Sequence, residues 1–232
     1  MIVGNSNGRK VKLAGTYVSS PLTWALVGRP NSSNIVTPIL RYGISRKGSG
    51  SHTMAFYSSM LDKVRDKSSL SFHIANNFSG LRQGLLNNDF DGFLWEIFTT
   101  KPFIDNGELG LIKLVPTPWS AFSFVINSDI PEETRNILYN SVFPALDEAI
   151  NMFQDPKNEN EMINRICKEH GHKEPDAMLW LSRCTYGNAK KFGIDYRHTA
   201  DSIDILKETG IVDKKYNIIQ LFHDDAKLYN KK

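Results

Sequence analysis

The chain has 232 residues, of which 41% are hydrophobic and 23% charged, and its formal net charge is +3. These values are ordinary for a soluble globular protein, and the length suffices for one large domain or two small ones. Lysine and arginine are scattered along the chain, so we expect no nucleic-acid partner. No apolar run approaches the roughly 18 residues that a membrane helix needs, so we expect no membrane insertion.

The two cysteines, Cys167 and Cys184, do not form the pattern of a disulfide framework and fit a reducing compartment. The start of the chain, "MIVGNSNGRK", is too short and polar for the apolar core of a signal peptide. With Met1 as the natural start, we therefore expect a cytoplasmic protein.

In chain order, the hydrophobic pattern alternates between strands and helices up to about residue 127. The expected strands are Val11–Val18, Leu22–Gly28, Ile39–Arg46, Leu70–Asn76, Asp91–Glu96, Leu109–Thr117 and Trp119–Asn127. Breaks are expected at Ser20-Pro21 and at Pro116 and Pro118.

Two helices are expected between these strands, and four more follow them. The expected helices are Gly50–Lys67, Ser79–Asp89, Pro131–Phe153, Glu159–Gly171, Glu174–Gly187 and His198–Val212. Ser79 is a possible N-cap, Pro144 a kink, and Gly171 and Gly187 close their helices. The sequence thus predicts an α/β core with parallel crossovers and a helical C-terminal third. Ligands bind such sheets beyond the carboxyl ends of the strands.

The first candidate site is the turn that follows Ile39–Arg46 and opens the next helix. It carries five candidate ligand-binding residues: Arg46, Gly48, Ser49, Gly50 and Ser51. Free amides and the helix dipole favour an anion or a polar acceptor there, and the serines add hydroxyl donors. The glycine spacing matches neither a Walker loop nor a dinucleotide-binding fingerprint. A simple serine-capped turn explains the same residues, and both interpretations stay open.

The second candidate is the end of Asp91–Glu96. An indole and a carboxylate, from Trp95 and Glu96, suit a flat ligand that carries nitrogen atoms. A core tryptophan beside an ordinary helix-start glutamate is the alternative.

Two extended segments are each broken by proline and carry a tryptophan. Ser20, Pro21 and Trp24 belong to the first, and Trp119 belongs to the second. They are candidate hinge crossings that line a ligand site, or else prolines at sheet edges. Cys167, His170 and His172 have the side-chain types of zinc ligands, but a histidine in a last helical turn is favoured by the dipole alone. We therefore expect no metal site, no cofactor and no catalytic residue.

Four segments together resemble one family: "GTYVSSPLTWALV", "RYGISRKGSGSHTMAF", "DGFLWEIFTTKPF" and "VPTPWSAFSFV". They are similar to the substrate-binding proteins of ABC transporters with the type 2 periplasmic-binding-protein fold. They resemble more closely an intracellular fungal branch related to thiamine-pyrimidine-precursor proteins. The resemblance implies two α/β lobes, 1–21 with 121–232 and 22–120, joined by two extended crossings with a ligand cleft between the lobes.

The chain departs from this family in two ways. Family members begin with a strand–helix–strand–helix unit that is absent here, which predicts an incomplete lobe 1 with exposed apolar surface. Their pyrimidine-synthesising relatives carry a cysteine-rich iron-binding run, whereas this chain has only Cys167 and Cys184.

The leading hypothesis is a non-enzymatic protein that binds a small polar, heteroaromatic ligand, such as a thiamine-type pyrimidine, with hinge closure of the lobes. The alternative is an enzyme of pyrimidine-precursor synthesis, or of related chemistry on a phosphorylated cofactor. It predicts bound iron or an aldehyde trapped on a lysine, which metal analysis and an absorbance spectrum would detect. The sequence does not indicate the oligomeric state.

Overall fold

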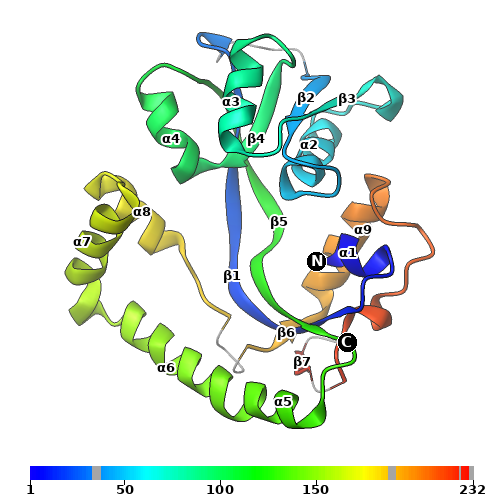
Figure 1. The fold of residues 1–232 in the computed structure, drawn as a ribbon, viewed down its shortest axis with the longest axis vertical. Helices are drawn as coiled ribbons and strands as arrows, with labels where there is room; N and C mark the ends of the chain where they lie inside the picture. Colours follow the sequence, from blue (N-terminus) through cyan, green and yellow to red (C-terminus); the bar gives the residue numbers. More distant parts are fainter. Residues whose placement is uncertain (33–37, 188–191, 225, 230–232) are drawn as a thin grey trace. The chain divides into compact units, whose positions relative to one another are not determined.

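The computed structural model describes residues 1–32, 38–187, 192–224 and 226–229 (Figure 1). It contains two compact units, each built from separate stretches of the chain. Unit 1 consists of Met1–Pro21, Trp119–Ile203 and Lys215–Lys232, and unit 2 of Leu22–Pro118 and Asp204–Lys214. Asp204–Lys214 thus belongs to unit 2, between two stretches of unit 1. The expected lobes themselves stay a prediction.

Two long strands, β1 (Val11–Gly28) and β5 (Gly110–Asn127), contribute residues to both units. Each has 18 residues, and the two are neighbours in a five-stranded sheet of order β3-β2-β4-β1-β5 (Figure 1). The predicted breaks at Ser20-Pro21 and at Pro116 and Pro118 were therefore wrong. A proline removes one donor without ending a strand, provided that neighbouring groups keep the two strands together. Next to Pro21, the Leu22 amide donates to the side-chain oxygen of Thr117 over 3.0 Å.

The sheet of unit 2 is mixed. Strand β2 (Arg41–Ile44) pairs in parallel with β3 (Ser71–Ile74) and with β4 (Gly92–Glu96), as the sequence predicts. Strands β1 and β4 are antiparallel, with Trp24 opposite Glu96, so the expected parallel arrangement does not extend to β1. Parallel pairing is expected for two strands that one helical crossover joins. Strands β2 and β3 lie between β1 and β4 in the sequence, so β1 and β4 are not such a pair.

Three α-helices follow the strands of unit 2: α2 (Gly50–Leu61), α3 (Phe78–Leu86) and α4 (Ile97–Asp105). Helix α2 ends before the predicted Lys67 because Lys63 adopts a positive φ of 58°. The predicted N-cap of α3, Ser79, was wrong. Asn77 caps this helix instead by accepting from the Gly80 amide over 2.9 Å, and asparagine is among the strongest N-caps. A short 3-10 turn, η2, covers Lys67–Ser69.

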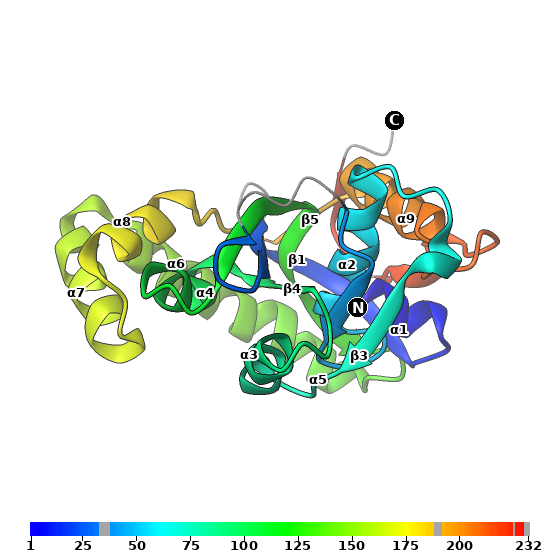
Figure 2. The same cartoon turned by 90° about the horizontal axis from the view of Figure 1, so that it is seen from above.

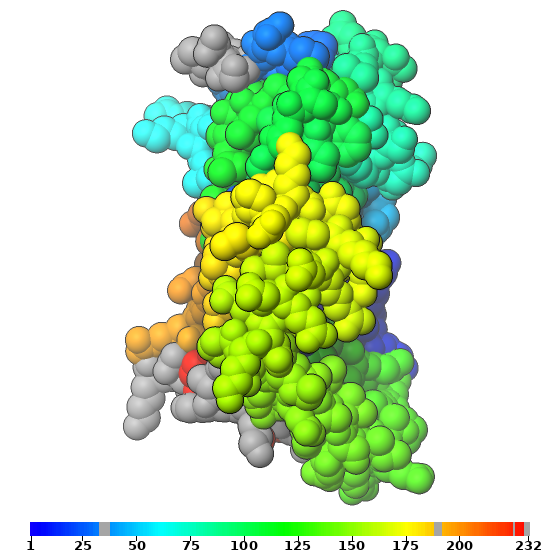
Figure 3. Space-filling view, turned by 90° about the vertical axis from the view of Figure 1, so that its left-hand side faces the viewer, coloured from blue at the N-terminus to red at the C-terminus, as the bar shows by residue number. Residues whose placement is uncertain are grey.

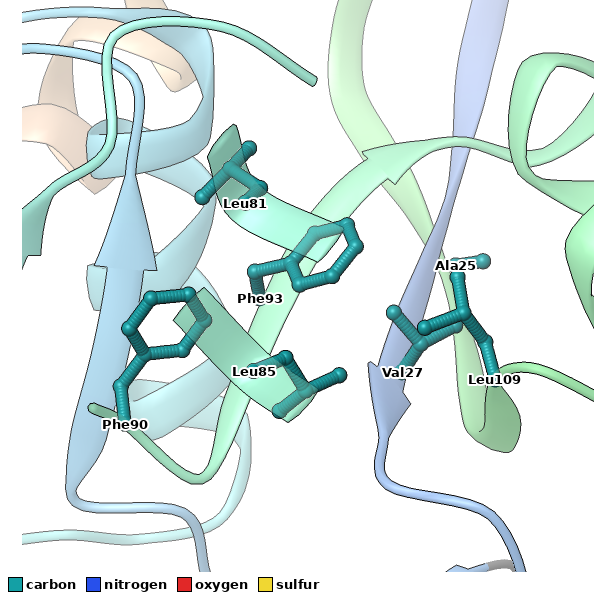
Figure 4. Close-up of a cluster of buried hydrophobic side chains, with 7 residues drawn as sticks. All are labelled: Ala25, Val27, Leu81, Leu85, Phe90, Phe93 and Leu109. Carbon is teal, nitrogen blue, oxygen red and sulfur yellow. The ribbon is translucent and has the colours of Figure 1, made fainter. Parts of the chain in front are cut away.

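The core of unit 2 lies between the sheet and these helices (Figure 4). It contains Ala25, Val27, Leu81, Leu85, Phe90, Phe93 and Leu109, each at most 2% exposed. Leu81 and Leu85 come one helical turn apart, while Phe93 belongs to β4 and Val27 to β1. Apolar residues with helical spacing and apolar residues of the strands thus pack in one cluster.

Unit 1 is mainly helical after β5, as predicted. Its helices are α5 (Glu132–Ile137), α6 (Phe143–Gln154), α7 (Glu159–His170), α8 (Glu174–Arg183) and α9 (Tyr196–Glu208), the last of which continues into unit 2. A short helix, α1 (Ile2–Ser6), precedes β1, and two 3-10 turns cover Pro156–Asn158 (η4) and Ile218–Leu221 (η5). The two short strands β6 (Ile194–Asp195) and β7 (Leu228–Tyr229) pair in parallel.

The predicted irregularity at Pro144 takes the form of a π-helical turn, η3 (Leu138–Val142), between α5 and α6. Proline lacks an amide donor, so one helical hydrogen bond is lost at this point, and a wider turn accommodates the loss.

The glycine that was expected to close α7 does so, because Gly171 has a φ of 68°. The corresponding prediction for Gly187 was wrong, since α8 ends at Arg183. Gly187 instead donates its amide to the Tyr17 carbonyl over 2.8 Å. A Cβ at this position would lie 2.3 Å from the Thr16 carbonyl oxygen, so the close approach to β1 requires glycine.

Helices α7 and α8 lie side by side (Figure 2) and share a cluster of Ile163, Ile166 and Ala177. Their outer surface faces the viewer in Figure 3. A second cluster of unit 1 joins Ala14 and Val18 of β1 to Phe143, Ile150, Tyr186 and Phe192. Among the described residues, no helix has both the length and the apolar character to cross a bilayer.

Candidate functional site

Most of the predicted site residues belong to unit 2. The turn before α2 contributes Arg46, Gly48, Ser49, Gly50 and Ser51, strand β1 contributes Trp24, and the end of β4 contributes Trp95 and Glu96. Ser20, Pro21 and Trp119 belong to unit 1.

The turn that opens α2 is held by Ser49 and His52. Ser49 is the N-cap, and its hydroxyl oxygen accepts the amide of His52 over 3.3 Å. In return, Nδ1 of His52 accepts the amide of Gly48 over 3.1 Å, and Gly48 itself needs a positive φ of 73°. Burial, together with the charge of Lys47, lowers the pKa of His52, which keeps the ring neutral as this hydrogen bond requires. The sequence analysis missed this role of His52, although its position three residues after an N-cap serine was a usable signal.

The serine side chains of this turn bind one another. The Ser51 hydroxyl oxygen accepts the Ser45 amide at 3.0 Å and lies 3.0 Å from the hydroxyl of Ser49 and 3.3 Å from that of Ser45. All three residues are at most 5% exposed. Their hydroxyl groups therefore fix the shape of the turn, which is the serine-capped turn considered as the alternative to a ligand site.

The groups of this turn that remain for a ligand are backbone amides. The first amides of a helix have no carbonyl partner within it, which applies to Gly50 and Ser51 in α2. Arg46 and Lys47, just before the helix, are exposed cations. Positive charge and the helix dipole act in the same direction there.

An aromatic group lies against this turn. A Cβ at Gly50 would come within 2.9 Å of Cη2 of Trp24, so the indole packs directly on the first residue of α2. The ring centroids of Trp24 and Trp95 are 6.3 Å apart at an angle of 67°, an edge-to-face pair. Phe78, the first residue of α3, has its ring centroid 5.5 Å from that of Trp95. The structure thus brings three separate sequence predictions, Trp24, Gly50 and Trp95, into one cluster.

The indole nitrogen of Trp24 is buried, and no acceptor for it lies within hydrogen-bonding distance among the described residues. An unpaired buried donor costs about 1–3 kcal/mol, so such groups normally have an acceptor. Nε1 of Trp24 is thus a donor of this cluster whose acceptor is missing among the described residues.

Glu96 caps helix α4. One carboxylate oxygen accepts the Phe98 amide at 3.0 Å, and the other accepts the Thr99 amide at 2.8 Å and the Thr99 hydroxyl at 3.0 Å. A carboxylate has about four acceptor positions, and three are used here. The structural role that we considered as the alternative for Glu96 is present, and any contact to a ligand uses the remaining position.

In unit 1, Ser20 is tied to the segment after α8. Its hydroxyl oxygen accepts the Thr185 amide at 3.0 Å, and the Thr185 carbonyl accepts the amides of Ser19 at 2.8 Å and Ser20 at 3.2 Å. Pro21 is exposed within β1, and Trp119 lies in β5. Thr185 could not be found from the sequence, because its contact with β1 spans more than half of the chain.

Comparison with known proteins identifies the fold. The model of the Ca3427-like family of periplasmic binding proteins (PBP) matches residues 24–115. A search of curated proteins gives no match.

Among solved structures, the Candida albicans CA3427 gene product superposes with a TM-score of 0.84 at 23% identity, covering 100% of this chain and 78% of that protein. It is described as defining a new family with the generic periplasmic-binding-protein fold. The aliphatic sulphonate-binding protein SsuA of Escherichia coli has a TM-score of 0.64 at 15% identity and covers 100% of this chain and 75% of its own.

The alkanesulfonate-binding protein SsuA of Xanthomonas axonopodis, bound to MOPS, has a TM-score of 0.68 at 11% identity, with 98% and 76% coverage. The chain therefore has the α/β fold of periplasmic binding proteins, as the sequence predicts.

Proposed function

We propose that this protein binds a small polar heteroaromatic ligand, such as a thiamine-type pyrimidine, without catalysing a reaction. The observation that carries the proposal is the packing of Trp24 on Gly50 at the start of α2, with Trp95 at 6.3 Å. This places aromatic surface, an indole donor and the amides of a helix N-terminus in one region of unit 2. The fold supports the proposal, because its solved relatives include proteins named for ligand binding.

In this proposal each group has one task. Trp95 stacks on the ligand ring, while Nε1 of Trp24 and the amides of Gly50 and Ser51 donate to its ring nitrogens or polar substituents. The remaining lone pair of Glu96 accepts from an exocyclic amino group. The hinge closure implied by the resemblance stays a prediction.

Calorimetry with 4-amino-5-hydroxymethyl-2-methylpyrimidine tests this function. Base–aromatic stacking contributes about 1–3 kcal/mol, so Trp95→Leu should weaken binding by roughly 5- to 150-fold. Trp180→Leu in α8 of unit 1 is the matched control and should leave the affinity unchanged. Equal affinities for the two variants would contradict the proposed stacking. Absence of saturable binding across a panel of pyrimidines would contradict the ligand class.

A second candidate is an anionic ligand, favoured by the helix N-terminus with Arg46 and Lys47 beside it. The two SsuA relatives are named for sulphonate binding. The same titration with the phosphate ester of the pyrimidine and with MOPS separates the two candidates. If an anionic group is recognised, the charged ligands bind more tightly, their affinity falls with salt, and Arg46→Gln weakens them selectively.

A cytoplasmic location and a relation to the fungal branch are parts of this proposal. Both cysteines, Cys167 and Cys184, are free thiols, which supports a reducing environment. Fractionation of cells that express the natural full-length gene checks the location.

A further inference from the structure

Unit 1 contains a pocket that the proposed function does not use. Its volume is about 120 Å³. Polar side chains from β1, β5, β6, β7 and α9 line it, and those that matter here are Ser19, Ser120, Asp195, His198, Thr199 and Tyr229. All of these residues belong to unit 1.

His198 lines this pocket, and one of its ring nitrogens is buried without a partner among the described residues. The Nε2 atom of His198 is buried, and none of the described residues offers it a hydrogen bond. The backbone on either side of the ring is fixed, because the His198 amide donates to the Asp195 carboxylate at 3.0 Å and its carbonyl accepts the Ser202 hydroxyl at 2.6 Å. An unpaired buried nitrogen on a residue that lines a pocket points to a missing partner.

The other polar groups show what kind of partner fits. The Ser19 hydroxyl donates to the Thr185 carbonyl at 3.1 Å, and the Thr199 hydroxyl donates to the Asp195 carbonyl at 2.7 Å. Each hydroxyl has a single proton, so both oxygens face further partners only as acceptors.

The pocket also contains a negative charge. The Asp195 carboxylate can only accept, and burial, together with the charge of this carboxylate, raises the pKa of the nearby Tyr229 hydroxyl. The phenol therefore stays neutral, and Asp195 supplies the formal charge among these side chains. A carboxylate with several acceptor oxygens disfavours an anion and favours a cation that carries several N–H donors.

We propose that this pocket binds a small primary amine in its ammonium form. The ammonium group has three donors, which match the oxygen atoms of Asp195 and Thr199 and the unpartnered Nε2 of His198. The volume of about 120 Å³ admits a molecule of a few heavy atoms, so the ligand is a short amine or the amino end of a longer molecule. The site is separate from the pyrimidine-binding proposal and does not depend on it.

A titration of the full chain with ethanolamine tests the site, with acetate as an anionic probe of similar size. The Asp195→Asn variant removes the charge but keeps an oxygen that can accept the His198 amide, so the start of α9 stays capped. We expect this variant to bind ethanolamine at least tenfold more weakly. Asp201→Asn makes the same change at an exposed position of the same helix and should not alter the affinity.

The ring nitrogens of His198, followed by nuclear magnetic resonance, locate the binding. Saturable shifts of the His198 signals with ethanolamine, and none with acetate, support the proposal. No saturable shift, equal affinity in Asp195→Asn, or equal binding of acetate would overturn it. If Asp195→Asn does not fold, Thr199→Val removes one acceptor oxygen with little change of shape and should weaken binding several-fold. Unaltered pyrimidine affinity in Asp195→Asn separates this test from that of the proposed function.

Discussion

The contact between Gly50 and Trp24 makes a quantitative prediction for the variant Gly50→Ala. Replacing glycine by alanine in a helix normally stabilises it by about 0.5–1 kcal/mol. Here the added Cβ would lie 2.9 Å from Cη2 and 3.2 Å from Cζ2 of Trp24. Overpacking of this kind costs about 1–3 kcal/mol, so the clash exceeds the gain and the free energy of unfolding should fall by about 1 kcal/mol.

A double-mutant cycle separates this clash from other effects. Trp24→Phe removes the two ring atoms that meet the new methyl group, so Gly50→Ala should cost nothing, or even stabilise, in that background. The expected coupling energy between the two positions is about 1–2 kcal/mol.

Urea unfolding followed by far-ultraviolet circular dichroism measures all four proteins, because this signal does not depend on the tryptophan that is removed. Gly4→Ala in α1 is the matched control, since its Cβ would meet only Arg9 Cδ, at 3.4 Å. Two outcomes would refute the reasoning: stabilisation by Gly50→Ala alone, or additive effects of the two substitutions within about 0.3 kcal/mol.

Three further predictions concern unit 2. Phe93→Ala should lower the free energy of unfolding by about 3–5 kcal/mol in urea, because the ring is 0% exposed in the core; a loss below about 1 kcal/mol would contradict this. Glu96→Ala should cost about 1 kcal/mol through loss of the α4 cap, and unchanged pyrimidine affinity by calorimetry would show that capping is its whole role. The lowered pKa of His52 means that the unfolded chain binds its proton more readily than the folded protein. The free energy of unfolding should therefore decrease as the pH falls below the ordinary histidine value of 6.5. His52→Asn keeps an acceptor for the Gly48 amide and should reduce this pH dependence, whereas an unchanged slope would assign it to other groups.

Much of the fold of unit 2 could be predicted because its signals are local. Apolar residues recur with helical spacing in α2 and α3 and with strand spacing around β2, β3 and β4, so each element was expected near its observed place. The family resemblance then supplied the fold, which the structural comparison confirms.

The errors arose where distant residues decide the outcome. A proline at position 21 indicates a break until the pairing of β1 with residues about 95 positions later is known. Gly187 indicates a helix end until its approach to Thr16 is known. The error at Ser79 was local: Asn and Ser are about equally good N-caps, and the helix begins after Asn77 rather than after the serine that we selected.

The candidate site was only partly predictable for a related reason. The residue types that suit a ligand were found from the sequence, but the same types also suit capping and packing. The Ser49 and Ser51 hydroxyl groups are used inside their own turn, and Glu96 is used by α4, whereas the sequence alone left both interpretations open. The contacts of Trp24 could be found only from the tertiary structure. Pairing of β1 with β4 brings Trp24 close to Trp95, and packing of α2 brings Gly50 against Trp24.

The interleaving of the two units has a consequence for how the protein is made. Unit 2 needs residues Asp204–Lys214, and the Lys67 ammonium group donates to the carbonyl of Glu208 within this segment. Unit 1 needs both Met1–Pro21 and the stretch from Lys215 onward. On the ribosome the chain grows at about 5–20 residues per second from the N-terminus, so β1 emerges well before its partners β4 and β5. Unit 2 therefore stays incomplete until Lys214 has been synthesised, and unit 1 until the stretch that begins at Lys215 has followed.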